Sequence, residues 1–193
     1  MRRLKILVAD DESIIRLGLR TMLTALGHEV LLAANGRDAL ELVRNARPDL
    51  ALLDLQMPLT DGLEAARAIA RKTPMPIIVL TAYSRADLLE KAAQLPIQGY
   101  LVKPVSERDL AAAIEVAMAR FDDSQAAARQ IAELRDDLET RKVVDRAKGA
   151  LMKAGLAEDA AFLAIQHRAR ENRINLRQAA ELILAETSRK TGP

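Results

Sequence analysis

A short apolar segment that ends in a single acidic residue sets the fold class of this chain. The segment Leu50 to Leu53 contains no polar residue, Asp54 follows it directly, and Met57-Pro58 and Asp61-Gly62 then break any regular element. An apolar run of this length between turn signals is typical of a strand that is buried on both faces of a parallel sheet. Ligands of open α/β sheets bind outside the carboxyl ends of the strands. Asp54 therefore stands where a reactive carboxylate would be placed.

Segments of the same kind alternate with helical patterns over roughly the first 120 residues. Strands are predicted over Lys5–Ala9, Val30–Ala33, Leu50–Leu53, Ile77–Thr81 and Gly99–Val102. Helices are predicted after Ser13, over Arg37–Asn45, Leu63–Arg71 and Arg85–Leu95, and after Ser106. Ser13 can cap the first helix, and Ser106 forms a capping box with Asp109 at the last. Five strands alternating with five helices predict a (βα)₅ doubly wound α/β domain with a parallel sheet.

Polar residues stand at the carboxyl ends of four of these strands. Asp10 and Asp11 follow the first strand, Asp54 the third, Thr81 ends the fourth and Lys103 follows the fifth. We expect these side chains to converge on one edge of the sheet. Carboxylates gathered in one space repel each other unless a cation lies among them, and oxygen ligands alone suit Mg²⁺. Asp11 and Asp54 would hold the metal, and Asp54 could attack a phosphorus atom. Lys103 and Thr81 would bind phosphate oxygens.

The chain after Ser106 is predicted to continue as one long helix. Residues 107–153 contain no proline and no glycine before Gly149, so the helix would extend beyond the α/β domain. A short apolar seam lies along it, with residues spaced by four, three and four: Ala127, Ile131, Leu134 and Leu138. This spacing indicates a short coiled coil, and an amphipathic, solvated linker is the alternative.

The C-terminal part is predicted to be an all-α three-helix bundle. Gly155 allows a turn, a second helix covers Glu158–Arg170, and Asn175 caps a third helix that reaches Glu186. The bundle would be closed by apolar residues of these two helices, namely Phe162, Ile165, Leu176, Ala180, Ile183 and Leu184.

Charge divides the chain into three parts, although the formal net charge is only +2. Residues 1–120 carry 16 Lys and Arg against 15 Asp and Glu, residues 121–140 carry 2 against 6, and residues 141–193 carry 11 against 6. The net charges are therefore +1, −4 and +5. We predict an α/β domain over 1–121, a helical coiled-coil linker over 122–140 and a basic bundle over 141–193, which would suit an anionic partner.

Composition restricts the cellular setting. The sequence has no cysteine, which excludes disulfides and thiolate metal sites and fits a reducing cytosol. The apolar run at the N-terminus is short and ends in acids, unlike a signal peptide, and no segment approaches the length of a membrane span. We expect a cytoplasmic protein without a membrane partner.

Four motifs of the α/β domain together resemble the receiver domain of two-component response regulators. They are VADDE at 8–12, LLDLQMPLTDG at 52–62, VLTA at 79–82 and YLVKP at 100–104. The resemblance covers residues 4–121 and implies the flavodoxin-like fold of these receivers. Another family with an acidic nucleophile, the haloacid dehalogenase-like phosphatases, would have Asp-x-Asp after the first strand and does not match.

The resemblance implies a role for each residue of the acidic cluster. Asp54 would accept phosphate from a sensor histidine kinase. Asp11, Asp54 and the backbone carbonyl of Gln56 would bind Mg²⁺, and Asp10 would orient the water shell of the metal. The protein would assist its own phosphorylation without being a turnover enzyme.

The resemblance also implies a switch beside this cluster. Thr81 and Tyr100 match the family's switch pair, in which the hydroxyl moves toward the phosphate and the ring turns inward. Lys103-Pro104 matches a Lys-Pro pair that is usually joined by a cis peptide bond.

The basic bundle carries a second resemblance. The segments LRDDLETRKVVDRAKGALM at 134–152 and AAFLAIQHRARENRINLRQAAELI at 160–183 resemble the ANTAR domain, an RNA-binding module of transcription antiterminators. Two features depart from its pattern: the turn at 153–156 is shorter, and Arg168 stands where an apolar residue is common. A bundle with net charge +5 can bind phosphates through counterion release, and guanidinium planes can stack on unpaired bases. The predicted RNA contacts are Arg141, Lys142, Arg146, Lys148 and Arg173.

Together these features predict a regulator that binds RNA hairpins under the control of phosphorylation. Phosphorylation would favour a homodimer, whose two bundles would grip paired hairpins and prevent a terminator from forming. Two alternatives remain open: a response regulator that binds DNA, and a receiver that signals only by docking proteins or by dimerisation.

Overall fold

The computed structural model describes residues 2–57, 62–82 and 95–190, and the chain divides into two compact units. The first unit spans residues 1–125 and the second residues 126–193. Each unit is described by itself.

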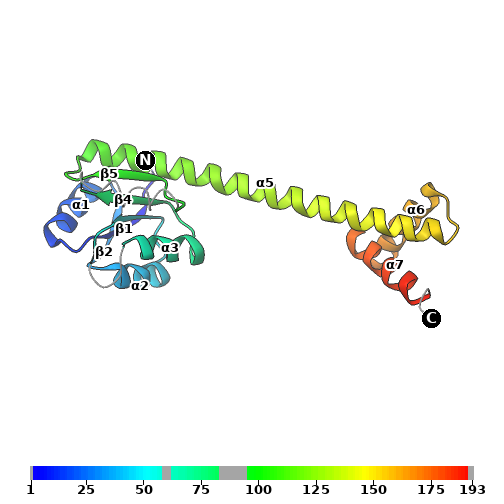
Figure 1. The fold of residues 1–193 in the computed structure, drawn as a ribbon. Helices are drawn as coiled ribbons and strands as arrows, with labels where there is room; N and C mark the ends of the chain where they lie inside the picture. The colour runs from blue at the N-terminus through cyan, green and yellow to red at the C-terminus, as the bar shows by residue number, and fades with distance from the viewer. Residues whose placement is uncertain (1, 58–61, 83–94, 191–193) are drawn as a thin grey trace. The chain divides into compact units, whose positions relative to one another are not determined.

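The first unit is a five-stranded parallel sheet with helices on both faces (Figure 1). Its elements are β1 (Lys5–Ala9), α1 (Ser13–Ala25), β2 (Glu29–Ala33), α2 (Gly36–Ala46), β3 (Leu50–Asp54), α3 (Gly62–Lys72), β4 (Ile77–Thr81), β5 (Gly99–Val102) and the first part of α5 (Glu107–Lys153). The strand order is β2-β1-β3-β4-β5, with β3 in the centre. The chain adds β2 on one side of β1 and the later strands on the other side, so the topological switch point lies between β1 and β3. This is the predicted doubly wound α/β fold. The predicted helix Arg85–Leu95 falls on residues 83–94, which lie outside the described part of the chain.

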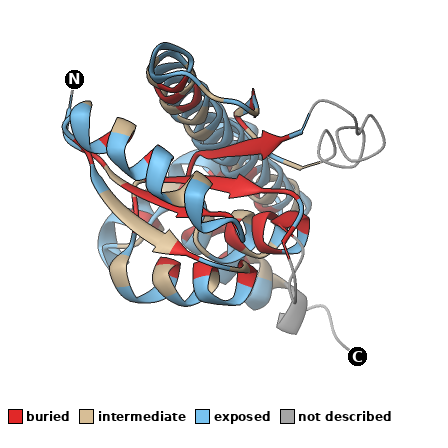
Figure 2. Cartoon of the chain, turned by 90° about the vertical axis from the view of Figure 1, so that its left-hand side faces the viewer, coloured by how far each residue is buried: buried red, intermediate tan, exposed pale blue. Residues whose placement is uncertain are grey.

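Two apolar layers hold this sheet, one on each face. On one face, Leu19 and Leu23 of α1 and Leu110 and Ile114 of α5 pack against the strands. On the other face, helices α2 and α3 cover the sheet, with Ile69 of α3 fully buried. Figure 2 shows the central strands as an almost continuous buried layer. Both faces of β3 are covered, which explains why its sequence is apolar without alternation.

The helix starts are capped in different ways. Asn35 caps α2, since its side chain accepts a hydrogen bond from the Asp38 backbone amide. Ser106 caps α5 by accepting from the Asp109 backbone amide, as predicted. The predicted cap by Ser13 is wrong: Glu12 is the N-cap residue of α1, and it makes no side-chain capping bond. The Asp10 carboxylate is the local acceptor instead, because the backbone amide of Glu12 donates to it.

His28 is buried between α1 and β2, and it accepts a hydrogen bond where a protonated ring could only donate. Its Nδ1 atom accepts from the Leu4 backbone amide at 3.3 Å, and its Nε2 atom is buried without a partner. Burial lowers the pKa of His28 below its ordinary value of 6.5. A proton that binds the unfolded chain is therefore excluded from the folded one.

We expect the receiver-like unit to lose stability as the pH falls below 6.5, because the unfolded state then binds a proton that the folded state does not. One proton limits the slope to about 1.4 kcal/mol per pH unit. Urea unfolding at a series of pH values down to about 5 would measure it. In His28→Asn, the amide oxygen can still accept a hydrogen bond from the Leu4 amide, but the side chain cannot bind a proton. The difference in free energy of unfolding between wild type and this variant should therefore shrink as the pH falls. A difference that does not change with pH would contradict this assignment.

The second unit consists of the C-terminal part of α5, α6 (Glu158–Asn172) and α7 (Leu176–Lys190), the predicted three-helix bundle. Gly155, with φ of +100°, provides the predicted turn after α5. Asn175 caps α7 by accepting from the Gln178 backbone amide, also as predicted. The core is formed by small and branched side chains of all three helices, among them Val144, Ala147, Ala161, Ile165, Ala169, Ala179, Ala180 and Ile183.

Phe162 was predicted in the core of this bundle, and that prediction is wrong. Its side chain is 37% exposed, whereas Ala161, Ile165 and Ala169 form the buried stripe of α6. The spacing of these three residues fixes the inward face of the helix, and Phe162 lies one position away from it.

The predicted seam on α5 is exposed along a single chain. Ile131, Leu134 and Leu138 are 51%, 56% and 57% exposed. The second half of α5 therefore presents an apolar row to the outside at coiled-coil spacing. Within the described residues, no helix has both the length and the apolar character needed to cross a bilayer.

Candidate functional site

Three carboxylates meet at the carboxyl edge of the sheet, as their positions after β1 and β3 predict. Ligand oxygens of Asp10, Asp11 and Asp54 all lie within 4.8 Å of one another. Asp10 and Asp54 are buried, and Asp11 is exposed. The loop that carries Asp10 and Asp11 is held by Arg16, whose guanidinium donates to both of their backbone carbonyls, at 2.7 and 2.9 Å. Sequence reasoning did not identify Arg16, because its role depends on the first turn of α1.

Lys103 reaches into this cluster from the end of β5. Its Nζ atom donates a hydrogen bond to Asp54 Oδ2 at 2.7 Å and lies 2.6 Å from Asp10 Oδ2. The second contact is an ion pair without hydrogen-bond geometry. Asp10 Oδ2 is therefore a buried oxygen that contacts the Lys103 ammonium but accepts no hydrogen bond from the described residues. The peptide bond between Lys103 and Pro104 is cis. The structure thus brings one ammonium group between two buried carboxylates.

The pKa values of the central pair reflect this arrangement. Burial raises the pKa of Asp54 above its ordinary value, against the opposing effect of the hydrogen bonds from Lys103 and from the Gln56 amide. Burial alone would lower the pKa of Lys103, but its contacts with the carboxylates of Asp10 and Asp54 outweigh burial and raise it. Lys103 is therefore a stable cation, and Asp54 is a carboxylate whose charge is poorly solvated.

The remaining predicted residues lie around Asp54. Thr81 ends β4 and is buried, and its hydroxyl donates to the Ala82 carbonyl at 3.1 Å. The backbone amide of Gln56 donates to Asp54 Oδ1 at 3.1 Å and fixes the direction of that carboxylate. Tyr100 lies on β5 with a side chain that is 42% exposed.

Gly62 is a further residue of this site, and sequence reasoning treated it only as a break. A side chain at this first position of α3 would overlap the backbone carbonyl of Asp54, and its Cβ would lie 3.0 Å from Leu55 Cα. All three near atoms belong to the backbone, so no rotamer change relieves the overlap. The start of α3 therefore approaches the end of β3 as closely as it does only because residue 62 is glycine.

The donor set fits a small divalent cation. Three carboxylates face one ammonium, so the cluster carries excess negative charge, and among the described residues its ligand atoms are all oxygens. Hard cations such as Mg²⁺ prefer this chemistry. Asp11 and Asp54 are the residues that would hold the ion.

Comparison with known proteins decides the family. Residues 6–115 match the response regulator receiver domain, and residues 132–184 match the ANTAR domain. The chain belongs to the response regulators and carries an ANTAR domain. It is 44% identical over 182 residues to the transcriptional regulatory protein PdtaR of Mycobacterium tuberculosis, which covers 93% of this chain and 89% of that protein.

Other relatives share the receiver part. A probable transcriptional regulator, ycf27 of Galdieria sulphuraria, is 41% identical over 121 residues, which cover 63% of this chain and 48% of that protein. A crystal structure of a response regulator receiver domain protein from Clostridium thermocellum matches with a TM-score of 0.56 and 36% identity, over 60% of this chain and 94% of that one. A receiver domain of a diguanylate cyclase from Desulfovibrio desulfuricans matches with a TM-score of 0.60 and 30% identity, over 64% of this chain and 99% of that one.

The five basic residues predicted to contact RNA do not form one patch on the ANTAR domain. By helical spacing, Arg141 and Lys148 lie on one side of α5, and Lys142 and Arg146 lie on another. Arg173 ends α6 in the left-handed region, with φ of +52°. Their role in binding RNA stays a prediction.

Two of these five residues already have acidic partners. Lys148 contacts Glu158 of α6 at 2.8 Å, and Lys142 contacts Glu139 at 2.8 Å. In the described residues, the charged groups of Arg141, Arg146 and Arg173 contact no carboxylate. Of the five predicted contacts, these three arginines are therefore the ones that an anion could bind without displacing an acid.

Arg168, which departs from the ANTAR pattern, has a structural explanation. Its guanidinium donates two hydrogen bonds to the Glu186 carboxylate, at 2.8 and 3.1 Å, and so joins α6 to α7. Such a two-point contact is the geometry that arginine favours and lysine cannot make.

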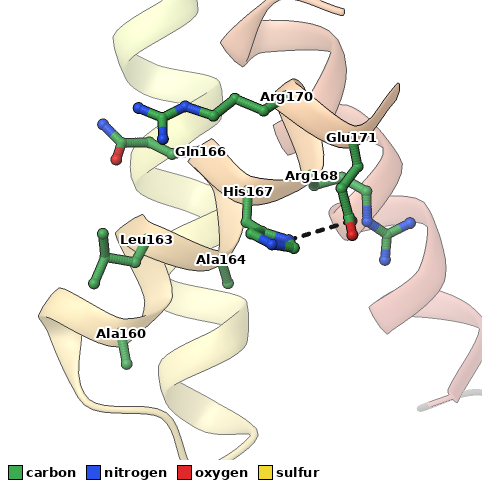
Figure 3. A pocket seen from close by; sticks show the side chains of 8 residues that line it. All are labelled: Ala160, Leu163, Ala164, Gln166, His167, Arg168, Arg170 and Glu171. Atoms are coloured by element: carbon green, nitrogen blue, oxygen red, sulfur yellow. Dashed lines mark ion pairs between the residues drawn. The ribbon is translucent and has the colours of Figure 1, made fainter. Parts of the chain in front are cut away.

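The outer side of α6 forms a shallow depression of about 560 Å³ (Figure 3). Leu163 and Ala160 line one part of it, and His167 pairs with Glu171 at 3.3 Å in another. His167 lies on the surface and His28 in the core, and neither belongs to a group of metal ligands in the described chain.

Proposed function

We propose that a sensor histidine kinase phosphorylates Asp54 of this response regulator, and that phosphorylation controls binding of RNA hairpins by the ANTAR domain. Its role would be transcription antitermination, carried out in the cytoplasm. One observation carries the proposal: an ammonium group sits between two buried carboxylates at the sheet edge of a chain that also has an ANTAR domain.

The residues around Asp54 suit phosphoryl transfer. A carboxylate oxygen of Asp54 forms a bond to phosphorus as the phosphorus–nitrogen bond of a phosphohistidine breaks. The Lys103 ammonium, 2.7 Å from Asp54, can then move its contact to a phosphoryl oxygen, and the Thr81 hydroxyl can donate to another. A bound Mg²⁺ would neutralise part of the phosphoryl charge. These groups serve one acceptor and do not make the protein a turnover enzyme.

The surface beside Lys103 suits a protein donor. A groove of about 150 Å³ runs between α1 and the segment after β5, lined by Ile15, Met22 and Pro104 among others. Ile14 and Leu17 of α1 are large apolar residues with exposures of 75% and 54%. A phosphoryl donor must come within bonding distance of Asp54, so its carrier would cover this surface.

The route from Asp54 to the output would use Thr81, Tyr100 and α5. The Thr81 hydroxyl can leave the Ala82 carbonyl for the phosphoryl group, which frees space for the half-exposed Tyr100 ring to turn inward. The exposed apolar seam on α5 supports a homodimer, since two such rows can bury each other. Dimer formation would place two ANTAR domains on one RNA.

The test is RNA binding by the full chain with and without acetyl phosphate. An RNA probe is first selected with the phosphorylated protein from a pool of hairpins with randomised loops. We expect acetyl phosphate and Mg²⁺ to strengthen binding at least about tenfold, a change of about 1.4 kcal/mol, and to favour the dimer in sedimentation. Asp54→Asn should show neither effect.

Competitors and salt separate the alternatives. Duplex DNA should compete weakly, and the slope of binding against salt should report several phosphate contacts. Equal binding to duplex DNA would favour a DNA-binding regulator. A dimer that forms without binding either nucleic acid would leave only a docking function.

A further inference from the structure

Gly149 lies inside α5, where neither packing nor backbone conformation calls for glycine. A Cβ atom at this position would meet no atom within 4 Å. The left-handed glycine that ends the helix is Gly155, and Gly149 has no positive φ. Glycine is, apart from proline, the least favourable residue within a helix, so alanine would stabilise α5 here. The described residues therefore offer no reason for the missing side chain at this position.

The surroundings of Gly149 are basic. Arg146 and Lys153, three residues before it and four after it, are its neighbours on the helix surface, and both are exposed. Within the described residues, neither contacts a carboxylate. Lys142, one further turn away, is exposed and paired with Glu139. We call Lys142, Arg146, Gly149 and Lys153 the basic face of α5.

The basic face points away from the core of the ANTAR domain. Val144 and Ala147, on the opposite side of α5, are buried against α6 and α7. Asp145 borders the basic face, and Met152, 44% exposed, lies beside it. The face is thus an open helix surface with cations before and after a point where the backbone is bare.

We propose that the sugar–phosphate backbone of RNA crosses α5 at Gly149, where the missing side chain lets it approach the helix backbone closely. Arg146 and Lys153 neutralise the phosphates on either side. They are seven residues apart, which corresponds to about 10 Å along the helix, a span that one strand can bridge. The proposal rests on the proposed RNA-binding function and specifies where on the ANTAR domain it occurs.

The charge of this face selects its partner. A second copy of the same face would bring like charges together, which opposes self-association there. The exposed apolar seam at Ile131, Leu134 and Leu138 offers a dimer surface that lacks this repulsion. A polyanion gains counterion release from the cations and needs no side chain at Gly149 for contact.

The test compares two glycine-to-alanine variants of the full chain. Gly149→Ala and Gly18→Ala each add one methyl group to a helix glycine with nothing within 4 Å. Both should raise the melting temperature, because both helices gain propensity. Only Gly149→Ala should weaken binding of the selected hairpin RNA, by about tenfold, with acetyl phosphate present in every assay.

A charge variant supplies a second readout. Arg146→Ala should lower the slope of log affinity against log salt by about one, as expected for the loss of one phosphate contact. Arg146→Lys should restore the slope.

The outcomes separate the two proposals. If Gly149→Ala binds the selected RNA as tightly as wild type, the close approach at Gly149 is wrong while RNA binding stands. If the wild-type chain selects no RNA from the pool, the proposed function fails, and this inference fails with it.

Discussion

Replacing Asp54 with asparagine is expected to abolish phosphorylation while making the magnesium-free receiver domain more stable. The amide is not a nucleophile toward phosphorus, so acetyl phosphate should leave no acyl phosphate on the chain. Intact-mass spectrometry would measure this loss directly. In the proposed scheme, the RNA affinity of the variant should also no longer respond to acetyl phosphate.

The gain in stability follows from the charges at the sheet edge. Oxygens of Asp10, Asp11 and Asp54 lie within 4.8 Å of one another, and Lys103 supplies one positive charge against three negative ones. The variant removes one carboxylate and leaves Lys103 paired with Asp10 at 2.6 Å. We expect its free energy of unfolding, measured with urea in EDTA, to rise by about 1 kcal/mol, which is typical of single stabilising substitutions.

Magnesium should make wild type more stable than Asp54→Asn, which reverses the order of stability expected in EDTA. An ion that binds only the folded state stabilises it by mass action, and Asp54 would be one of its ligands. Wild type should therefore gain stability on addition of Mg²⁺, and Asp54→Asn should gain much less. Asp123→Asn, at an exposed carboxylate of α5, is the matched control and should change neither phosphorylation nor stability. A variant that is less stable than wild type in EDTA would contradict the electrostatic argument.

Sequence alone predicted the sheet well because its three inner strands, β1, β3 and β4, are buried on both faces. β1, β4 and β5 have the predicted bounds, and β2 and β3 each extend one residue further. Apolar runs of four or five residues bounded by turn residues are typical of such strands and are too short for helices. The positions of Asp10, Asp54 and Lys103 then follow from the direction of a parallel sheet.

The errors and omissions come from contacts that local patterns do not encode. Ser13 has the right residue type for a cap, but the Asp10 carboxylate already accepts the Glu12 amide. Pairs between helices, such as Lys148 with Glu158 and Arg168 with Glu186, join residues ten and eighteen positions apart. Sequence periodicity marks such residues only as exposed. In the bundle core, Ala161, Ile165 and Ala169 fill the inward face of α6, and the larger Phe162 beside them stays partly exposed.

Gly62→Ala is expected to be the most damaging single-methyl change in the receiver domain. The added carbon would overlap the Asp54 carbonyl, lie 2.8 Å from its carbonyl carbon and lie 3.0 Å from Leu55 Cα. Only a shift of β3 or α3 can remove the overlap, and both elements are packed in the sheet core, where Leu53 and Ile69 are buried. We expect a loss of about 3 kcal/mol or more, because strain in a packed core is not easily relieved.

A glycine-to-alanine change elsewhere in the domain should raise the free energy of unfolding instead of lowering it. Gly18 of α1 has nothing within 4 Å of its Cβ position, so Gly18→Ala should gain up to about 1 kcal/mol from helix propensity. Urea unfolding of the two variants would measure both effects. If Gly62→Ala folds with reduced stability, acetyl phosphate should label it more slowly than wild type, since Asp54 belongs to the backbone that must move. Equal stability of Gly62→Ala and wild type would show that α3 can shift freely, and the close approach would then not be what positions Asp54.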